Sequence, residues 1–172
     1  MNIGAMQAEV LEWAKSKGWE PDPDRTFDDE CALIHSEISE ALEAYRTWKF
    51  DDATDAITGK PEGVGSELAD VLIRLLHYSA CGSFSLDGKI ARYMPEHGEP
   101  KLGNVVSRMH HTISKAWSIH PYSKSRATHY MRRLLRLLLD FCEQQEFDLE
   151  KEYRRKMDYN KTRSYRHGNR AM

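Results

Sequence analysis

The chain has 172 residues, a formal net charge of −2 at pH 7, 40% hydrophobic residues and 30% charged residues. This composition excludes a largely disordered chain and predicts a single folded domain over residues 1–172. We expect no membrane segment, because no apolar run approaches the roughly 18 residues that cross a bilayer. We also expect no secretion signal, because Glu9 and Glu12 lie where such a signal would be apolar. The three cysteines lie far apart without a Cys-x-x-Cys pair, which excludes a disulfide scaffold or zinc ribbon and predicts a cytoplasmic protein with reduced thiols.

The charged residues are unevenly distributed along the chain. Residues 20–70 carry 15 acidic and 4 basic side chains, a net charge of −11. Residues 151–172 carry 8 basic and 2 acidic side chains, a net charge of +6. An acidic block followed by a basic tail points to a cation site in the first and an anion site in the second.

Apolar residues recur at helical spacing along most of the chain, and β-branched runs are scarce, so strands are not expected. The predicted fold is all-α, an antiparallel helical bundle with a four-helix core and additional helices. Thr26 and Asp29 form a capping-box pattern at the start of one helix. The predicted helices cover about residues 4–17, 26–48, 66–80, 104–119, 124–146 and 148–160, and Gly- and Pro-rich connections cover 51–65 and 82–103.

Two neighbouring helices within residues 20–82 each carry a pair of carboxylates three residues apart. The pairs are Glu37 with Glu40 and Glu67 with Asp70, and each lies along one edge of an apolar stripe. If the stripes pack antiparallel, four carboxylates meet at the rim of the core and need a cation. Oxygen ligands of this kind suit Mg²⁺ or Mn²⁺. The alternative is that they are ordinary solvated helix carboxylates.

The basic tail, residues 148–172, has a spacing that suits an anion. Lys156, Asn160 and Arg163 occupy positions i, i+4 and i+7, so they share one face if the helix extends that far. Lysine and arginine side chains bind phosphate oxygens well. Beside a carboxylate metal site, this face favours a nucleotide polyphosphate. The alternatives are a frayed chain end and contact with a nucleic-acid backbone.

These motifs resemble those of the MazG-like all-α nucleoside triphosphate pyrophosphohydrolases. The similar segments are Glu37-Ile-Ser-Glu40, Glu67-Leu-Ala-Asp70-Val-Leu-Ile-Arg74 and residues 156–168. The resemblance extends over about residues 28–82 and 150–168, whereas residues 83–147 match nothing that we can name. It implies Mg²⁺-dependent hydrolysis of a (deoxy)nucleoside triphosphate between the α and β phosphates, with Mn²⁺ as a substitute metal, giving a monophosphate and pyrophosphate.

The resemblance also implies roles for individual residues and an assembly. Metal binding is implied for Glu37, Glu40, Glu67 and Asp70, a catalytic role for Glu40 and Glu37, and nucleotide binding for Lys156, Asn160, Arg163, Arg166 and His167. Glu40 is our choice for the group that accepts the proton of the attacking water, the alternative being that it only orients the metal. Family members are commonly dimers or tetramers, so we expect a homo-oligomer, a homodimer or homotetramer.

Several questions stay open at the level of the sequence. The competing function is a non-catalytic helical module that binds nucleic acid or a protein through the basic tail. Arg74 either counters the carboxylates or reaches a phosphate. Ile73 and Leu76 make the helix over 66–80 apolar on a second side, so it is either enclosed in the bundle or part of a subunit interface. The tryptophans Trp13, Trp48 and Trp117 are expected in the core rather than against a base.

Overall fold

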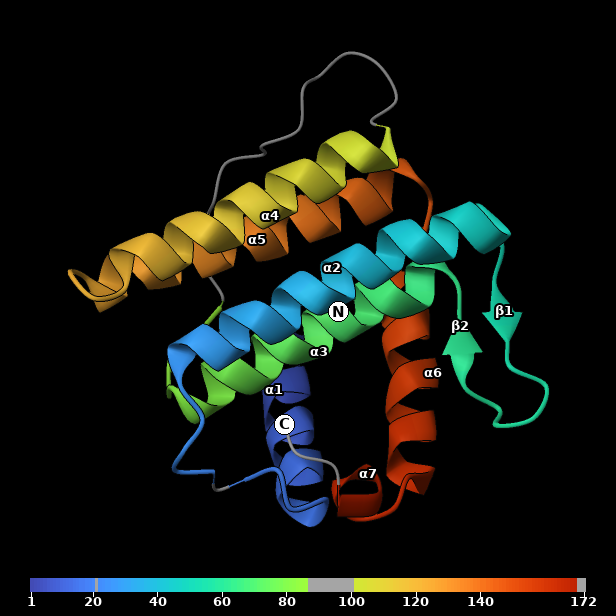
Figure 1. Cartoon of the computed structure of the whole chain (residues 1–172), viewed down its shortest axis with the longest axis horizontal. Helices are drawn as coiled ribbons and strands as arrows, with labels where there is room; N and C mark the ends of the chain where they lie inside the picture. Colours follow the sequence, from blue (N-terminus) through green and yellow to red (C-terminus); the bar gives the residue numbers. More distant parts are fainter. Residues whose placement is uncertain (21, 87–100, 170–172) are drawn as a thin grey trace.

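The computed structural model describes residues 1–20, 22–86 and 101–169, and these residues confirm the all-α prediction. Part of the predicted connection over 82–103 falls outside them. The elements in chain order (Figure 1) are α1 (Ile3–Ser16), α2 (Phe27–Trp48), β1 (Ala53–Thr54), β2 (Pro61–Glu62), α3 (Val64–Cys81), α4 (Leu102–Ile119), α5 (Lys124–Gln144), α6 (Leu149–Thr162) and α7 (Arg166–Asn169).

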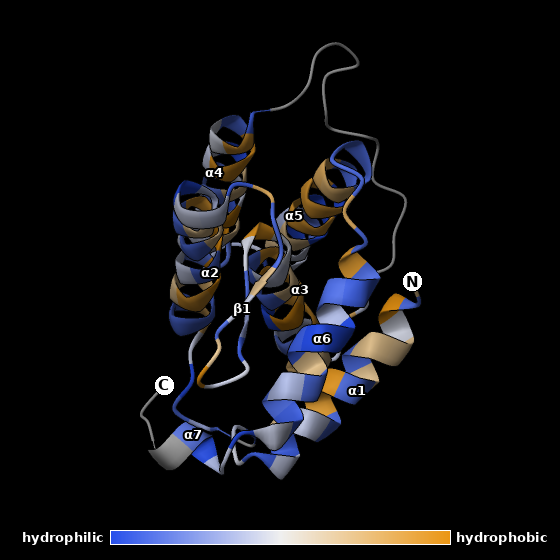
Figure 2. Ribbon diagram, turned by 90° about the vertical axis from the view of Figure 1, so that its right-hand side faces the viewer, coloured by the Kyte–Doolittle hydropathy of each residue, from blue (hydrophilic) through white to orange (hydrophobic). Residues whose placement is uncertain are grey.

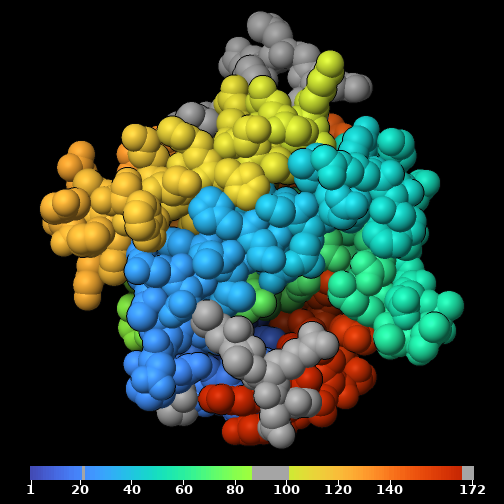
Figure 3. Space-filling model, in the orientation of Figure 1, coloured from blue at the N-terminus to red at the C-terminus, as the bar shows by residue number. Residues whose placement is uncertain are grey.

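Helices α2, α3, α4 and α5 lie side by side and form the four-helix core, with α1 and α6 running across the opposite side of α3 (Figure 1). The apolar faces of the helices point inward, toward one another (Figure 2). In the space-filling view, α2 lies at the surface along its length, between α4 and the α6–α7 end of the molecule (Figure 3). None of the described helices is long and apolar enough to cross a membrane.

Helix α3 is the central element, because it contacts α1, α2, α5 and α6. Ile73 and Leu76 on its second apolar side are both buried. The chain itself therefore encloses α3, and of the two interpretations of this helix the structure shows the enclosed one. The predicted homodimer or homotetramer stays a prediction without support from this feature.

Local signals explain where α2 and α3 begin. The predicted capping box is present at the start of α2, where Thr26 Oγ1 accepts a hydrogen bond from the Asp29 amide at 3.2 Å and Asp29 Oδ2 accepts one from the Thr26 amide at 2.8 Å. Gly63 precedes α3 with φ of 102°, and a Cβ atom there would lie 2.8 Å from the Asp51 carbonyl oxygen. Only glycine fits this turn, which fixes the register in which α3 presents Glu67.

The expectation of no strands is wrong over a short stretch. β1 and β2 pair antiparallel, with Ala53 opposite Glu62 and Thr54 opposite Pro61, and form a small hairpin between α2 and α3. Asp55 Oδ1 closes its turn by accepting hydrogen bonds from the amides of Ile57 and Thr58. Strands of two residues are too short to show an alternating pattern in the sequence.

Two histidines join α2 to α4. His35 Nδ1 lies 2.7 Å from His110 Nδ1, and the two rings are stacked with their centroids 5.0 Å apart. One nitrogen must donate and the other accept, so the contact requires that at least one ring be neutral. Burial lowers the pKa of both imidazoles, and His110 lowers that of His35 further.

We expect this pair to make the fold sensitive to acid. The folded-state pKa values lie below the unfolded value of about 6.5, so the unfolded chain binds more protons as the pH falls. The stabilisation is present above about pH 6.5 and is lost as the pH falls through the folded values. We expect the free energy of unfolding, measured with urea, to fall less between about pH 7.5 and pH 5.5 in His110→Gln than in the wild type. The exposed His129→Gln should keep the wild-type slope, and equal slopes for all three proteins would contradict this role.

Candidate active site

A cavity of about 420 Å³ opens where α1, α2, α3 and α6 come together. Its lining combines carboxylates, cations and aromatic rings from segments that are far apart in the sequence. The lining residues are Trp13, Ala14, Trp19, Arg25, Leu33, Glu37, Glu40, Lys60, Asp70, Ile73, Arg74, His77, Lys156, Tyr159, Asn160, Arg163 and His167.

Three of the four predicted metal ligands meet in this region. Glu37 of α2 and Glu67 and Asp70 of α3 each place a carboxylate oxygen within 4.8 Å of the other two. Glu37 and Glu67 are buried, with 8% and 2% of their surface exposed. The antiparallel packing of α2 on α3 thus brings the two pairs together as expected.

Glu40, the fourth predicted ligand, lies apart from these three oxygens. It is exposed on α2, lines the same cavity, and its Oε1 accepts a hydrogen bond from Ser36 Oγ at 3.0 Å. The i+3 spacing places it on the correct side of α2 but on the rim rather than in the buried cluster.

Each buried carboxylate has a cation beside it. Lys156 Nζ lies 2.7 Å from Asp70 Oδ2 and 3.5 Å from Glu67 Oε1. Lys60 Nζ lies 3.8 Å from Glu67 Oε1. Arg74 Nε donates a hydrogen bond to Glu37 Oε1 at 3.0 Å, and Arg74 Nη2 lies 3.0 Å from the same oxygen. Of the two roles left open for Arg74, the structure shows the pairing with a carboxylate.

The cluster is electrostatically costly in spite of these cations. Burial raises the pKa of Glu67 to about 7, with Lys156 acting in the opposite direction and Asp70 adding to the rise. Burial also raises the pKa of Glu37, against the effect of Arg74. Glu67 Oε2 is buried without a hydrogen-bond partner in the described part of the chain. Oxygen donors with an unsatisfied buried atom fit a hard divalent cation such as Mg²⁺ or Mn²⁺.

The predicted nucleotide-binding residues separate into two groups. Lys156, Asn160, Arg163 and His167 line the cavity, and the first two are buried on α6. Arg166 is not among the lining residues. Its Nε donates to the Gly18 carbonyl at 2.8 Å and its amide donates to the Lys17 carbonyl at 2.9 Å, so it connects the start of α7 to the residues that directly follow α1.

Aromatic residues complete the cavity, and the sequence analysis did not select them. Trp13 packs against the core as expected, but it also lines the cavity, and its Nε1 is buried without a partner among the described residues. Trp19 and His167 meet edge to face, 5.2 Å between centroids. Trp117, also expected in the core, is 52% exposed. Helical spacing alone does not distinguish a tryptophan in the core from one that lines a pocket.

Comparison with known proteins identifies one family. A family model described as dUTPase matches residues 2–167, and so includes residues 83–147, for which the motifs gave no match. The search of curated proteins and the search of solved structures returned no match. The MazG-like resemblance itself is not confirmed by this result.

We expect Lys156 to be essential to the stability of the site. Lys156→Met would leave the buried Glu67 and the half-buried Asp70 without their main counter-charge, at a cost of about 3–5 kcal/mol in unfolding free energy. Lys161→Met, on the exposed side of the same helix, breaks only surface ion pairs and should cost less than about 1 kcal/mol. Chemical denaturation of both variants at neutral pH measures the difference, and equal losses would contradict a buried ionic cluster.

Proposed function

The chain belongs to this dUTPase family, a family of nucleoside triphosphate hydrolases, and we propose that it hydrolyses dUTP to dUMP and pyrophosphate with Mg²⁺. The observation that carries the proposal is the position of two buried carboxylates and one half-buried carboxylate in the cavity region that the basic residues of α6 also line. As in the MazG-like enzymes that the motifs resemble, the bond that breaks lies between the α and β phosphates.

The residues of α6 suit a triphosphate. Lys156 and Asn160 lie one turn apart on α6, and Arg163, the residue directly after the helix, has extended backbone; all three line the cavity. The forked guanidinium of Arg163 suits phosphate oxygens, and the Asn160 amide adds a neutral donor. Lys156 contacts the carboxylates and lies next to Asn160 on the cavity, so its ammonium group connects the proposed metal-binding and phosphate-binding parts of the site.

The carboxylates would hold the metal. Glu37, Glu67 and Asp70 are its proposed ligands, with Glu40 at the rim. When bound, Mg²⁺ supplies charge neutralisation for the triphosphate and makes water more acidic. Glu40 is the proposed proton acceptor, because it lines the cavity while remaining accessible to water, and Ser36 orients its carboxylate through one oxygen.

The tryptophans suit the base. The indole nitrogen of Trp13 can donate a hydrogen bond but cannot accept one, and it has no partner among the described residues. The O4 carbonyl oxygen of uracil would satisfy it, whereas the amino group at the same position of cytosine would not. Trp19 and His167 offer apolar ring surface beside it.

The contacts of α6 do not favour the competing nucleic-acid module. Lys156 is buried against carboxylates, Arg154 and Lys161 both pair with Glu9, and Arg155 pairs with Glu152. Cations that already have partners within the chain gain less from binding a phosphate backbone. We therefore retain the enzymatic function alone.

We expect Glu67→Gln to abolish turnover. With dUTP and Mg²⁺, the wild type should release dUMP and pyrophosphate. The variant should be more than about 100-fold slower, because loss of a direct metal ligand reduces activity more than loss of a residue that only supports a ligand. Glu43→Gln is the matched control, since the Glu43 side chain is exposed on α2 and, within the described part of the chain, pairs only with Arg46. Product separation by ion exchange measures both, with dCTP, dTTP and UTP as comparison substrates.

Phosphate in place of pyrophosphate would contradict cleavage between the α and β phosphates. Equal rates for Glu67→Gln and the wild type would remove the carboxylate cluster from the reaction.

Turnover should also depend on pH through Glu67. Its pKa is raised to about 7, so a growing fraction of the carboxyl is protonated below neutrality and does not bind metal. At subsaturating Mg²⁺ we expect the rate to fall about tenfold per pH unit below about pH 7. High Mg²⁺ should move the acidic limb of the pH–rate profile to lower pH, because the metal competes with the proton for Glu67. A limb that does not respond to Mg²⁺ would show that another group controls the rate.

A further inference from the structure

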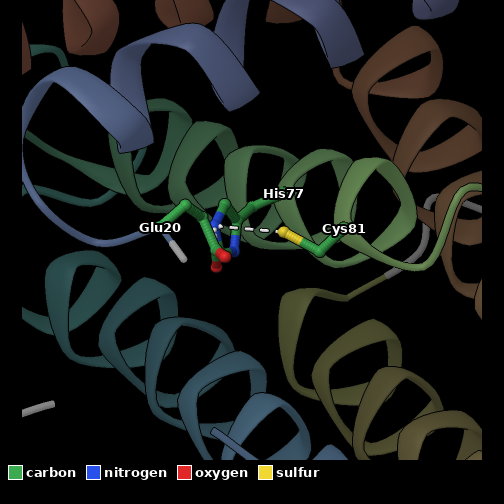
Figure 4. A group of neighbouring side chains, drawn as sticks. All are labelled: Glu20, His77 and Cys81. Carbon is green, nitrogen blue, oxygen red and sulfur yellow. Dashed lines mark hydrogen bonds and ion pairs between the residues drawn. The ribbon is translucent and has the colours of Figure 1, made fainter. Parts of the chain in front are cut away.

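The chemically active face of α3 continues beyond the carboxylates. Asp70, Arg74, His77 and Cys81 stand at i, i+4, i+7 and i+11, so they follow one stripe to the C-terminal end of the helix. There the side chain of Glu20, from the segment after α1, meets His77 and Cys81 (Figure 4). The donors in this second cluster are a carboxylate oxygen, an imidazole nitrogen and a sulfur, unlike the all-oxygen set beside it.

The two distances from His77 Nε2 to the other donors match those of a tetrahedral metal site. His77 Nε2 lies 3.1 Å from Glu20 Oε1 and 3.6 Å from Cys81 Sγ, and all three donors lie within 4.8 Å of one another. Zinc with ordinary bond lengths and tetrahedral angles separates nitrogen from sulfur by about 3.6 Å and nitrogen from oxygen by about 3.3 Å. One ring nitrogen therefore faces both other donors at ligand spacing, without rearrangement of the helix.

The surroundings of His77 resemble the outer shell of a metal site. Its other nitrogen, Nδ1, lies 3.7 Å from Oε1 of Glu30 on α2. Glu30 is only 4% exposed, and its Oε2 has no partner in the described residues. A histidine that binds metal through one nitrogen usually donates from the other to a carboxylate. A buried, partly unsatisfied glutamate in that position is a second observation, independent of the donor triad.

The charges also favour a divalent cation. Arg25 Nη1 lies 3.8 Å from Glu20 and 3.5 Å from Glu30, so one guanidinium faces two carboxylates. Burial, with a further contribution from Glu20 and Glu30, raises the pKa of the Cys81 thiol to about 12, which keeps it protonated in the metal-free protein. Metal binding displaces that proton to solvent and forms a metal–thiolate bond. With the thiolate formed, two carboxylates, one thiolate and Arg25 leave a net charge of −2, which one divalent ion neutralises.

We propose that Glu20, His77 and Cys81 form a binding site for Zn²⁺ or a similar borderline-soft divalent ion, separate from the carboxylate cluster. Nitrogen and sulfur donors select such ions over Mg²⁺. Three protein ligands leave one coordination position for water or another small ligand. Because His77 and Arg25 also line the cavity, the site adjoins the proposed nucleotide pocket. The proposal does not depend on the function assigned to that pocket.

Titration of the full-length protein with Co²⁺ in excess Mg²⁺ tests the site, because the Mg²⁺ occupies oxygen-donor sites. We expect one equivalent of Co²⁺ to give a thiolate-to-metal charge-transfer band in the near ultraviolet, and Zn²⁺ to remove it. Cys81→Ser, at an exposed position, should lose the band. Cys142→Ala, at a buried cysteine away from the cluster, should keep it.

The histidine and its outer-shell carboxylate give a second readout. Zinc affinity, measured by competition with a chromophoric chelator, should fall more than about 100-fold in His77→Gln and about 10–100-fold in Glu30→Gln. Absence of the band in the wild type, or its persistence in Cys81→Ser, would overturn the proposal. Unchanged zinc affinity in His77→Gln would also overturn it.

Discussion

The structure depends on the cost of holding Glu37, Glu67 and Asp70 together at the edge of the core. Ionised carboxylates in a region of low dielectric must be paired or the fold loses several kcal/mol. Lys156 of α6 provides most of the compensating charge, and α6 must therefore cross α3 at the level of Glu67 and Asp70. Gly65 permits that approach, because a Cβ atom there would lie 3.0 Å from Glu152 Cγ. The ionic cluster and the close packing of α6 on α3 are thus parts of one arrangement.

Helix α3 provides two different chemical environments at its two ends. Its first turns carry Glu67 and Asp70, whose hard oxygen donors face α2 and α6. Its last turns carry His77 and Cys81, whose softer donors face the segment between α1 and α2. Because the helix is enclosed on several sides, it fixes both sets relative to one cavity. A rigid buried helix positions metal ligands more accurately than a loop can.

The part of the site that could be predicted from the sequence is the part that depends on helical periodicity. Carboxylates at i and i+3 beside an apolar stripe predicted the meeting of α2 and α3, and the tail spacing predicted that Lys156, Asn160 and Arg163 share a face. The position of Arg166 could not be predicted, since its partner is the Gly18 carbonyl at the end of a distant helix. The approach of Glu20 to His77 was equally hidden, because no periodicity relates residues in different elements.

Under the proposed function, the different exposures of Lys156, Lys60 and Arg74 indicate which of these cations could change partners on nucleotide binding. Lys156 is 2% exposed and has little freedom to leave Asp70, whereas the Lys60 and Arg74 side chains are 35% and 33% exposed. If a metal ion takes over the carboxylates, Lys60 and Arg74 are free to turn toward the triphosphate, while Lys156 remains between the two. The two roles considered for Arg74 then belong to successive states of one side chain. Under the proposed function, the fold therefore holds the carboxylates of the acidic block and Lys156 of the basic tail in fixed positions, while the more exposed Lys60 and Arg74 exchange partners.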